Sequence, residues 1–131
     1  MNAKKIIQTL TMALMAMVAT AQSYVGTMEV NGYTRKEVVV QLAKTQQGEL
    51  VLKMFNVKFA RLMPVKVDVD IPGITLNGSR LQGNNIIPSS KGKPYERYRV
   101  TKLDGKADSQ QISFTCMMGD KPVKFSGKRK K

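Results

Sequence analysis

Short segments in which every second residue is apolar recur along this chain, and they constrain its fold more than any other feature. In the clearest one, which runs from Val65 to Ile71, the apolar side chains alternate with Lys66, Asp68 and Asp70. Alternation with period two places one face of a β-strand in a core and the other in water. No segment after residue 21 carries a helical period long enough to predict a helix. The pattern therefore predicts an all-β fold.

Turn-forming residues divide the chain into strands at hairpin spacing. Asn31-Gly32 is the dipeptide that most favours a tight hairpin, and Pro72-Gly73 and Asp104-Gly105 are also expected to end strands. Residues 79–93 are loop-like, and such an excursion is a place where function can lie. We predict strands at residues 24–30, 34–44, 49–57, 65–71, 74–76, 95–103, 110–118 and 121–128. Such a series is typical of a sandwich or barrel, and closure into a barrel removes the exposed edges.

The first 21 residues have the composition of a secretory signal peptide. Lys4 and Lys5 precede an apolar run from Ile6 to Val18, and Ala19-Thr20-Ala21 supplies the small residues of a cleavage site. The run is shorter than the roughly 20 residues that a bilayer requires. No cysteine follows the cleavage site to carry a lipid. We therefore expect residues 22–131 to form one exported domain, periplasmic or secreted, with neither a membrane span nor a lipid anchor.

The net charge points to an anionic partner. The formal charge of the whole chain is +13, and loss of the two leader lysines lowers it to +11. A strongly positive field attracts anions, and for an exported protein these are lipid headgroups, lipopolysaccharide phosphates or acidic glycans. The terminal run from Lys128 to Lys131 has a simpler interpretation as a solvated tail. Charge alone does not separate these alternatives.

The residue types that most enzymes need are scarce. The chain has no histidine, so a serine or cysteine nucleophile lacks its commonest base and a metal its commonest ligand. Cys116 shares one strand face with Ile112, Phe114 and Met118, which favours a buried, inert thiol over a disulfide-linked dimer. Asp68 and Asp70 share a strand face about 7 Å apart, which provides too few oxygen ligands for calcium. We predict neither an enzyme nor a cofactor or metal site.

Several segments, in their order and spacing, resemble a known family. They are Tyr24-Val25-Gly26, Leu50 to Phe55, Val67 to Ile74, Leu103 to Lys106, Gln111 to Met118 and Pro122 to Gly127. Together they resemble the calycin-like β-barrel family of small exported proteins of Bacteroidetes-type bacteria, whose shape is lipocalin-like. The resemblance implies an up-and-down antiparallel β-barrel of about eight strands. It implies no catalytic motif and no particular ligand.

The barrel interior is the first candidate site. An eight-stranded barrel holds either packed side chains or one small ligand, and methionines adapt to an apolar guest. A pocket would open at a barrel mouth, near residues 79–93. The inward residues predicted to contact a ligand are Met28, Leu52, Met54, Tyr98, Phe114 and Phe125. The leading prediction is a non-enzymatic module that binds a small apolar or amphipathic molecule, and a filled core is the alternative for the interior.

The basic outer surface is the second candidate site. Arg97 and Arg99 share a face of one predicted strand, and Lys121, Lys124 and Lys128 lie on the last one. If the last three strands pair as hairpins, Arg99 and Lys124 share an outer surface, separated by one strand. Such a stripe would dock on anionic envelope components. The aromatic residues alternate out of phase with most of these basic residues, which argues against nucleic acid, because bases stack on aromatics beside the cations.

Overall fold

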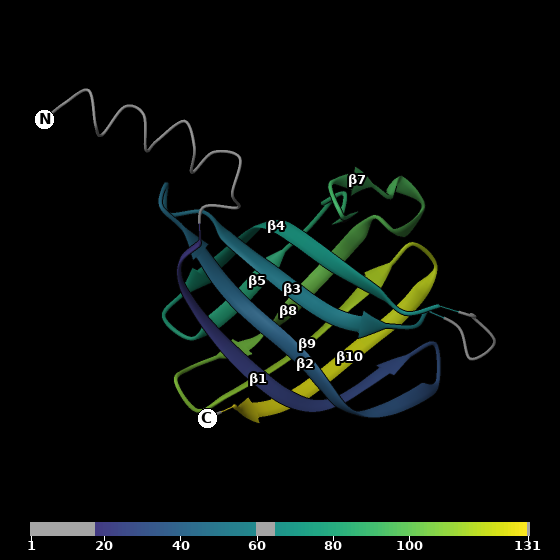
Figure 1. The fold of residues 1–131 in the computed structure, drawn as a ribbon, viewed down its shortest axis with the longest axis horizontal. Helices are drawn as coiled ribbons and strands as arrows, with labels where there is room; N and C mark the ends of the chain where they lie inside the picture. Colours follow the sequence, from purple (N-terminus) through teal and green to yellow (C-terminus); the bar gives the residue numbers. More distant parts are fainter. Residues whose placement is uncertain (1–17, 60–64, 131) are drawn as a thin grey trace, which may run out of the picture.

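The computed structural model describes residues 18–59 and 65–130. In chain order the elements are β1 (Val18–Val30), β2 (Tyr33–Thr45), β3 (Leu50–Val57), β4 (Val67–Asn77), β5 (Arg80–Gly83), β6 (Ser89–Ser90), β7 (Lys93–Pro94), the 3₁₀ turn η1 (Glu96–Tyr98), β8 (Val100–Ala107), β9 (Gln111–Met118) and β10 (Lys121–Arg129). Each barrel strand pairs antiparallel with the next, and β10 pairs with β1 to close the ring (Figure 1). The predicted up-and-down barrel is confirmed, with β6 and β7 outside the eight-stranded ring.

The first hairpin forms where the sequence predicts it. Asn31 and Gly32 both have positive φ, 50° and 83°, and Val30 pairs with Tyr33 across the turn. Positive φ at both central residues gives a turn whose twist matches that of the strands it joins, and Asn-Gly adopts it readily. At its other end β1 begins at Val18, so four residues of the predicted signal peptide continue this strand along β2. Residues 1–17 of that prediction lie outside the described residues.

The prediction that Pro72-Gly73 ends a strand is wrong. β4 continues to Asn77, and its pairing with β3 shifts register, because Leu52 lies opposite Ile71 whereas Leu50 lies opposite Ile74. Three steps along β4 thus match two along β3, which is a β-bulge. The bulge changes the phase of the alternation, so that both Ile71 and Ile74 are buried. Pro-Gly occurs both at a bend within a continuous strand and at the end of a strand, so the local sequence does not distinguish the two.

The region around residues 79–107 also differs from the prediction. Arg80–Gly83 forms β5, which pairs with β4 and β8, so the excursion starts later than predicted and continues to the start of β8, over residues 84–99. Asp104-Gly105 lies inside β8 instead of in a turn. A β-carbon on Gly105 would lie 2.0 Å from the Ser113 oxygen of β9, so close backbone approach explains this glycine. The strand predicted from residue 95 begins only at Val100.

The barrel interior is filled by side chains. Most residues on the predicted inward faces are buried, and Phe114 and Phe125 pack with ring centroids 5.7 Å apart. Leu42, Leu50 and Val67, on the same faces, are partly buried and pack against this core. Val65 is an exception, because it precedes β4 and is 58% exposed. The fully buried side chains include Tyr24, Val40, Leu52, Met54, Ile71, Leu81, Ile112, Met118 and Phe125. The interior of the barrel is therefore a packed core along its middle.

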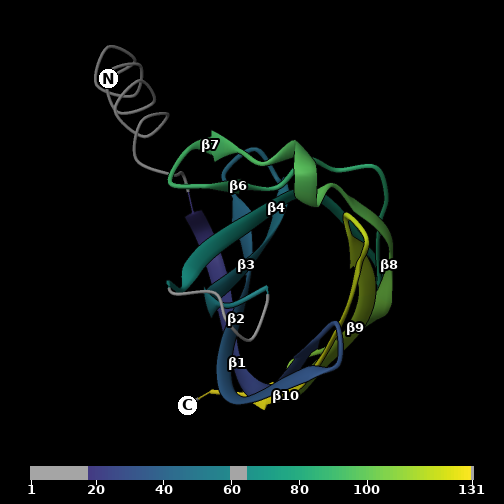
Figure 2. The ribbon, with the colours of Figure 1, turned by 90° about the vertical axis from the view of Figure 1, so that its right-hand side faces the viewer.

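The two ends of the barrel differ in their connections. Residues 46–48, 78–79 and 108–110 turn at the end where β1 starts and β10 finishes, which we call the termini end. Residues 31–32, 58–59, 65–66, 84–99 and 119–120 lie between strands at the opposite end, which we call the excursion end. Figure 2 faces the excursion end, where β6, β7 and η1 run along one side of the mouth. Among the described residues, the structure contains no helix with the length and apolarity needed to cross a bilayer.

Candidate functional site

An apolar pocket of about 380 Å³ opens at the excursion end of the barrel. Its volume lies at the lower limit of the roughly 300–1,000 Å³ typical of small-molecule sites. Two of the lining residues, Ser90 and Arg97, are polar or charged. The others are Phe59, Val65, Val67, Val69, Pro88, Tyr95, Tyr98 and Met118. The lining is therefore suited to an apolar body with a single polar group.

The excursion is held against the barrel from both sides. Ile86 and Val100 exchange backbone hydrogen bonds of 3.0 and 2.7 Å, which attach the start of the excursion to β8. Ser89 of β6 pairs with Asp70, which attaches the small hairpin to β4. The Tyr95 amide then donates to the Pro88 carbonyl at 2.9 Å. These backbone contacts place excursion residues over the mouth without using the side chains that line the pocket.

Two stacked aromatic rings form part of the pocket wall. The Phe59 and Tyr98 ring centroids lie 4.4 Å apart with 12° between the planes. Phe59 follows β3 and is 4% exposed, whereas Tyr98 ends the 3₁₀ turn and is half-buried. The two stacked rings form a flat apolar surface, and the apolar part of a bound molecule can pack beside it. The sequence alternation did not identify Phe59, because it lies beyond the strand whose period was read.

Arg97 is the cation at this pocket. Its guanidinium carbon lies 5.8 Å from the Tyr98 ring centroid, and its side chain is exposed. Neighbouring Arg99 instead donates to Glu96 Oε1 at 3.0 Å and to Asn85 Oδ1 at 2.7 Å. None of the ion pairs found among residues 18–59 and 65–130 includes Arg97. The Arg97 guanidinium is therefore a solvent-exposed charge at the rim of the pocket.

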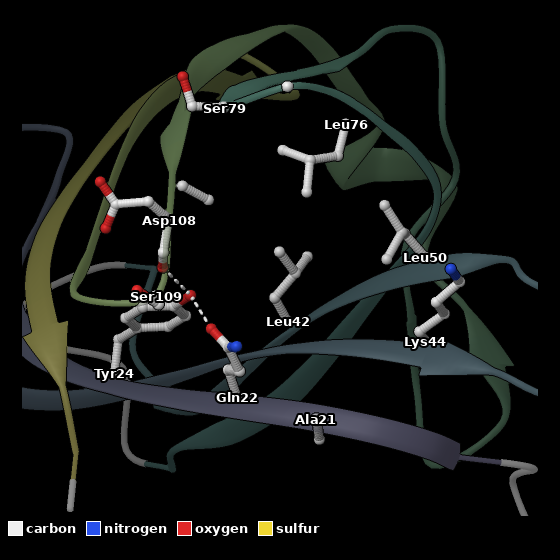
Figure 3. A pocket seen from close by; sticks show the side chains of 12 residues that line it. Ala21, Gln22, Tyr24, Leu42, Lys44, Leu50, Leu76, Ser79, Asp108 and Ser109 are labelled. Atoms are coloured by element: carbon white, nitrogen blue, oxygen red, sulfur yellow. Dashed lines mark hydrogen bonds between the residues drawn. The ribbon is translucent and has the colours of Figure 1, made fainter.

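A second pocket, of about 370 Å³, opens at the termini end (Figure 3). Leu42, Leu50 and Leu76 point into it, with Lys44 at its rim. Its remaining lining residues are Ala21, Gln22, Tyr24, Gly78, Ser79, Ala107, Asp108 and Ser109. This lining contains both signs of charge and more polar groups than the pocket at the excursion end. It is therefore less suited to an apolar guest.

A hydrogen-bonded tyrosine lies at the edge of this second pocket. Tyr24 Oη is 2.8 Å from both Gln22 Oε1 and the Asp108 carbonyl oxygen. A phenol has one proton, so it donates to one of these oxygens, and a flipped Gln22 amide would donate to the phenol. Burial raises the pKa of Tyr24, the Asp108 charge raises it further, and Arg129 opposes them. The phenol is therefore neutral and acts as a structural bridge between β1 and the turn at residues 108–110.

Five of the six predicted interior residues belong to the packed core. Met28, Leu52, Met54, Phe114 and Phe125 are between 0% and 2% exposed, and neither mouth pocket is lined by them. The sixth, Tyr98, does line the pocket at the excursion end. The structure thus gathers the apolar lining from the excursion and from strand ends. Ligand contact by the five core residues stays a prediction.

The basic stripe predicted on the outer surface does not form. Across β9, Lys124 aligns with Thr115 and then with Asp104 of β8, and on its other side it aligns with Glu29. The prediction that Arg99 shares this row is wrong, because Arg99 lies before β8, after a 3₁₀ turn.

The other basic residues predicted for the stripe are dispersed. Lys121 is partly buried with Asp120 Oδ1 4.0 Å away, and Lys128 lies near the termini end. Arg97 is in the 3₁₀ turn, not on a strand face. The register of β8 to β10 therefore mixes acids and bases along this side.

The remaining candidate groups have structural roles. Cys116 is free and 5% exposed, and burial raises the pKa of its thiol to about 12, as expected for an inert core thiol. Asp68 Oδ1 accepts a hydrogen bond of 2.9 Å from the backbone N–H of Asn56. The described residues contain no cluster of three or more side chains that could hold a metal ion. Asp68 therefore stabilises the β3–β4 pair.

Comparison of the chain with models of known protein families, with curated proteins and with solved structures found no match. The function is therefore argued from the geometry of the barrel mouth alone.

Proposed function

We propose that this chain is a non-enzymatic, exported binding protein that holds a small amphipathic molecule in the excursion-end pocket. One observation carries the proposal, namely a pocket of about 380 Å³ that combines an apolar lining with a single cation, Arg97. An apolar ligand body would pack against Val65 and Val67, above buried Val69, and beside the Phe59–Tyr98 stack. An anionic group such as a carboxylate, sulfonate or phosphate would lie at Arg97.

The two parts of the site make different contributions to affinity. Burial of apolar surface supplies about 25 cal/mol per Å² and is insensitive to moderate salt. The attraction of an anion to exposed Arg97 weakens with ionic strength, because the Debye length falls from about 10 Å at 0.1 M to about 3 Å at 1 M. We therefore expect tight binding to require the apolar body, with Arg97 selecting its anionic end. The alternative function is docking on anionic envelope components. It would have to use other basic residues, because Arg99 and Lys124 do not align in one stripe.

A fluorescence titration with anilinonaphthalene sulfonate tests the proposal, since this dye has an aromatic body and one sulfonate. Val69→Phe adds volume inside the excursion-end pocket, and Leu76→Phe adds similar volume at the termini end. We expect Val69→Phe to weaken dye binding at least tenfold, while Leu76→Phe leaves it unchanged. Thermal unfolding of both variants shows whether they fold, because overpacking typically costs about 1–3 kcal/mol.

The anionic group is tested with Arg97→Gln and a series of alkyl carboxylates that displace the dye. The variant should weaken carboxylates severalfold at 0.1 M salt and have little effect at 1 M. Matched alkyl alcohols should be insensitive to it. If Leu76→Phe weakens binding and Val69→Phe does not, the ligand lies at the termini end and the proposal is wrong. Absence of saturable binding by any of these molecules would instead support a packed barrel without a ligand.

A further inference from the structure

The large apolar side chains that the structure leaves exposed all lie at the excursion end. Among the described residues they are Val65, Tyr95 and Ile87, with 58%, 42% and 37% of their surface accessible. Val65 comes from the connection before β4, and Tyr95 and Ile87 come from the 84–99 excursion. Val65 and Tyr95 also line the mouth of the pocket. Single exposed apolar residues are ordinary, but their restriction to one end indicates a contact surface.

The same end carries an excess of positive charge. Its described connections contain six basic residues, Lys58, Lys66, Lys91, Lys93, Arg97 and Arg99, against the two acids Glu96 and Asp120. Arg99 is paired with Glu96, which leaves the other arginine and the lysines as the cations of this surface. Lys91 lies in the turn between β6 and β7, Lys93 is the first residue of β7, and both are exposed. Apolar and cationic side chains therefore project from the same connections.

We propose that the excursion end docks on the interface of an anionic lipid bilayer. Tyr95, Ile87 and Val65 would enter the headgroup layer, where a tyrosine keeps its ring in an apolar environment and its hydroxyl in a wet one. Lys91 and Lys93 would lie among the lipid phosphates. Opposite charge selects the anionic bilayer, since each basic residue near such a surface strengthens binding about fivefold. A soluble polyanion would use the same cations and leave the apolar side chains without a role.

This surface is separable from the pocket, so the proposal does not rest on the proposed function. Docking uses exposed side chains at the rim, whereas ligand binding uses the buried wall at Val69. Val69→Phe should therefore weaken dye binding at least tenfold and leave bilayer binding unchanged. If both activities were real, a ligand would enter or leave the pocket on the side that faces the membrane.

A single-tryptophan reporter tests insertion, because the chain contains no tryptophan. With Tyr95→Trp, vesicles of equal phosphatidylglycerol and phosphatidylcholine should shift the emission to the blue, and brominated lipids should quench it. Phosphatidylcholine vesicles should do neither. The matched control is Gln47→Trp in the exposed turn at the termini end, whose emission should stay that of a solvated indole. An unshifted spectrum for Tyr95→Trp on anionic vesicles would overturn the proposal.

Two matched pairs of substitutions separate this surface from net charge. Lys91→Ala with Lys93→Ala should weaken vesicle binding by about 25-fold, from a factor of about five for each lysine. Lys106→Ala with Lys128→Ala removes the same charge from exposed positions toward the termini end and should have little effect. Equal losses for the two pairs would show generic attraction to a basic protein, contrary to the proposal.

A third substitution separates insertion from attraction to a polyanion. Ile87→Ser keeps every charge and should weaken vesicle binding severalfold while leaving heparin binding unchanged. If Ile87→Ser has no effect on vesicles although the lysine variants do, the surface recognises polyanions without entering a bilayer. That result would reject the lipid interface as the partner. These are exposed positions, so circular dichroism and thermal unfolding should show native folding in each variant.

Discussion

The buried thiol makes the stability of this barrel sensitive to alkaline pH. Cys116 lies on β9 with 5% of its surface exposed, and burial raises its pKa from 9.0 to about 12. In the unfolded chain the thiol loses its proton more readily, so high pH favours unfolding. The stability that the protonated, buried thiol contributes is fully present below pH 9.0 and is lost as the pH rises toward 12. Stability should therefore fall on the alkaline side.

The size of the effect follows from the two pKa values. At pH 8 both states hold a neutral thiol, and at pH 11 the unfolded thiol is almost fully ionised whereas about one-tenth of the folded thiol is. The difference amounts to roughly 2–3 kcal/mol between pH 8 and pH 11, at about 1.36 kcal/mol per pKa unit. For a small domain this is a large part of a net stability of about 5–15 kcal/mol.

Urea unfolding followed by circular dichroism measures this difference, and Cys116→Ala is the control. Every other ionisable group is common to the two proteins, so the informative quantity is the change in unfolding free energy with pH in wild type minus that in the variant. The wild type should lose roughly 2–3 kcal/mol more than the variant between pH 8 and pH 11. The same loss in both proteins would refute the reasoning, since it would show that burial does not hold the thiol neutral.

Three further predictions concern the fold and its processing. Val69→Asp should prevent cooperative thermal unfolding, because it buries an unpaired carboxylate, whereas Lys66→Ala, just before the same strand, should change stability by less than about 0.5 kcal/mol. Similar melting curves for the two would contradict the orientation of β4. Gly105→Ala should destabilise the protein by about 2 kcal/mol or more in urea titrations, since a β-carbon there meets the backbone of β9, and neighbouring Lys106→Ala should not. N-terminal sequencing of the exported protein should start at Gln22, and an intact leader in the exported fraction would show that residues 1–21 are not removed.

Much of the barrel could be predicted because its long strands depend on local pattern. Alternation identified the buried faces of β2, β9 and β10, and Asn31-Gly32 identified the first turn. β5 was missed because a strand of four residues with Leu81 as its one buried side chain has too little alternation to recognise. Its pairing with β4 and β8 stabilises it instead. The bulge at Pro72-Gly73 was missed because the continuation of β4 is evident only from its pairing with β3, which the sequence does not show.

The candidate site was harder to predict than the fold. Tyr98 was identified as an inward residue and does line the excursion-end pocket, although it lies in a 3₁₀ turn instead of a strand. Phe59 and Pro88 join it from segments that carry no periodic signal, and Arg97 joins it from residues that alternate in sequence but form a 3₁₀ turn. Their convergence requires the backbone bonds that attach the excursion to β4 and β8. No spacing in the sequence encodes that attachment.

The sequence by itself determined most of the side chains that enter the core from the long strands, because the period of a strand assigns each residue to a face before any partner is present. It also determined the net positive charge and the absence of histidine chemistry. Only the tertiary structure decided which cations share a surface, since that depends on strand register, and a bulge or a 3₁₀ turn shifts register without changing composition. It placed Asp104 instead of Arg99 in the row of Lys124. It also brought the exposed Val65, Ile87 and Tyr95 to one end, because barrel closure brings connections distant in the chain together at a single mouth.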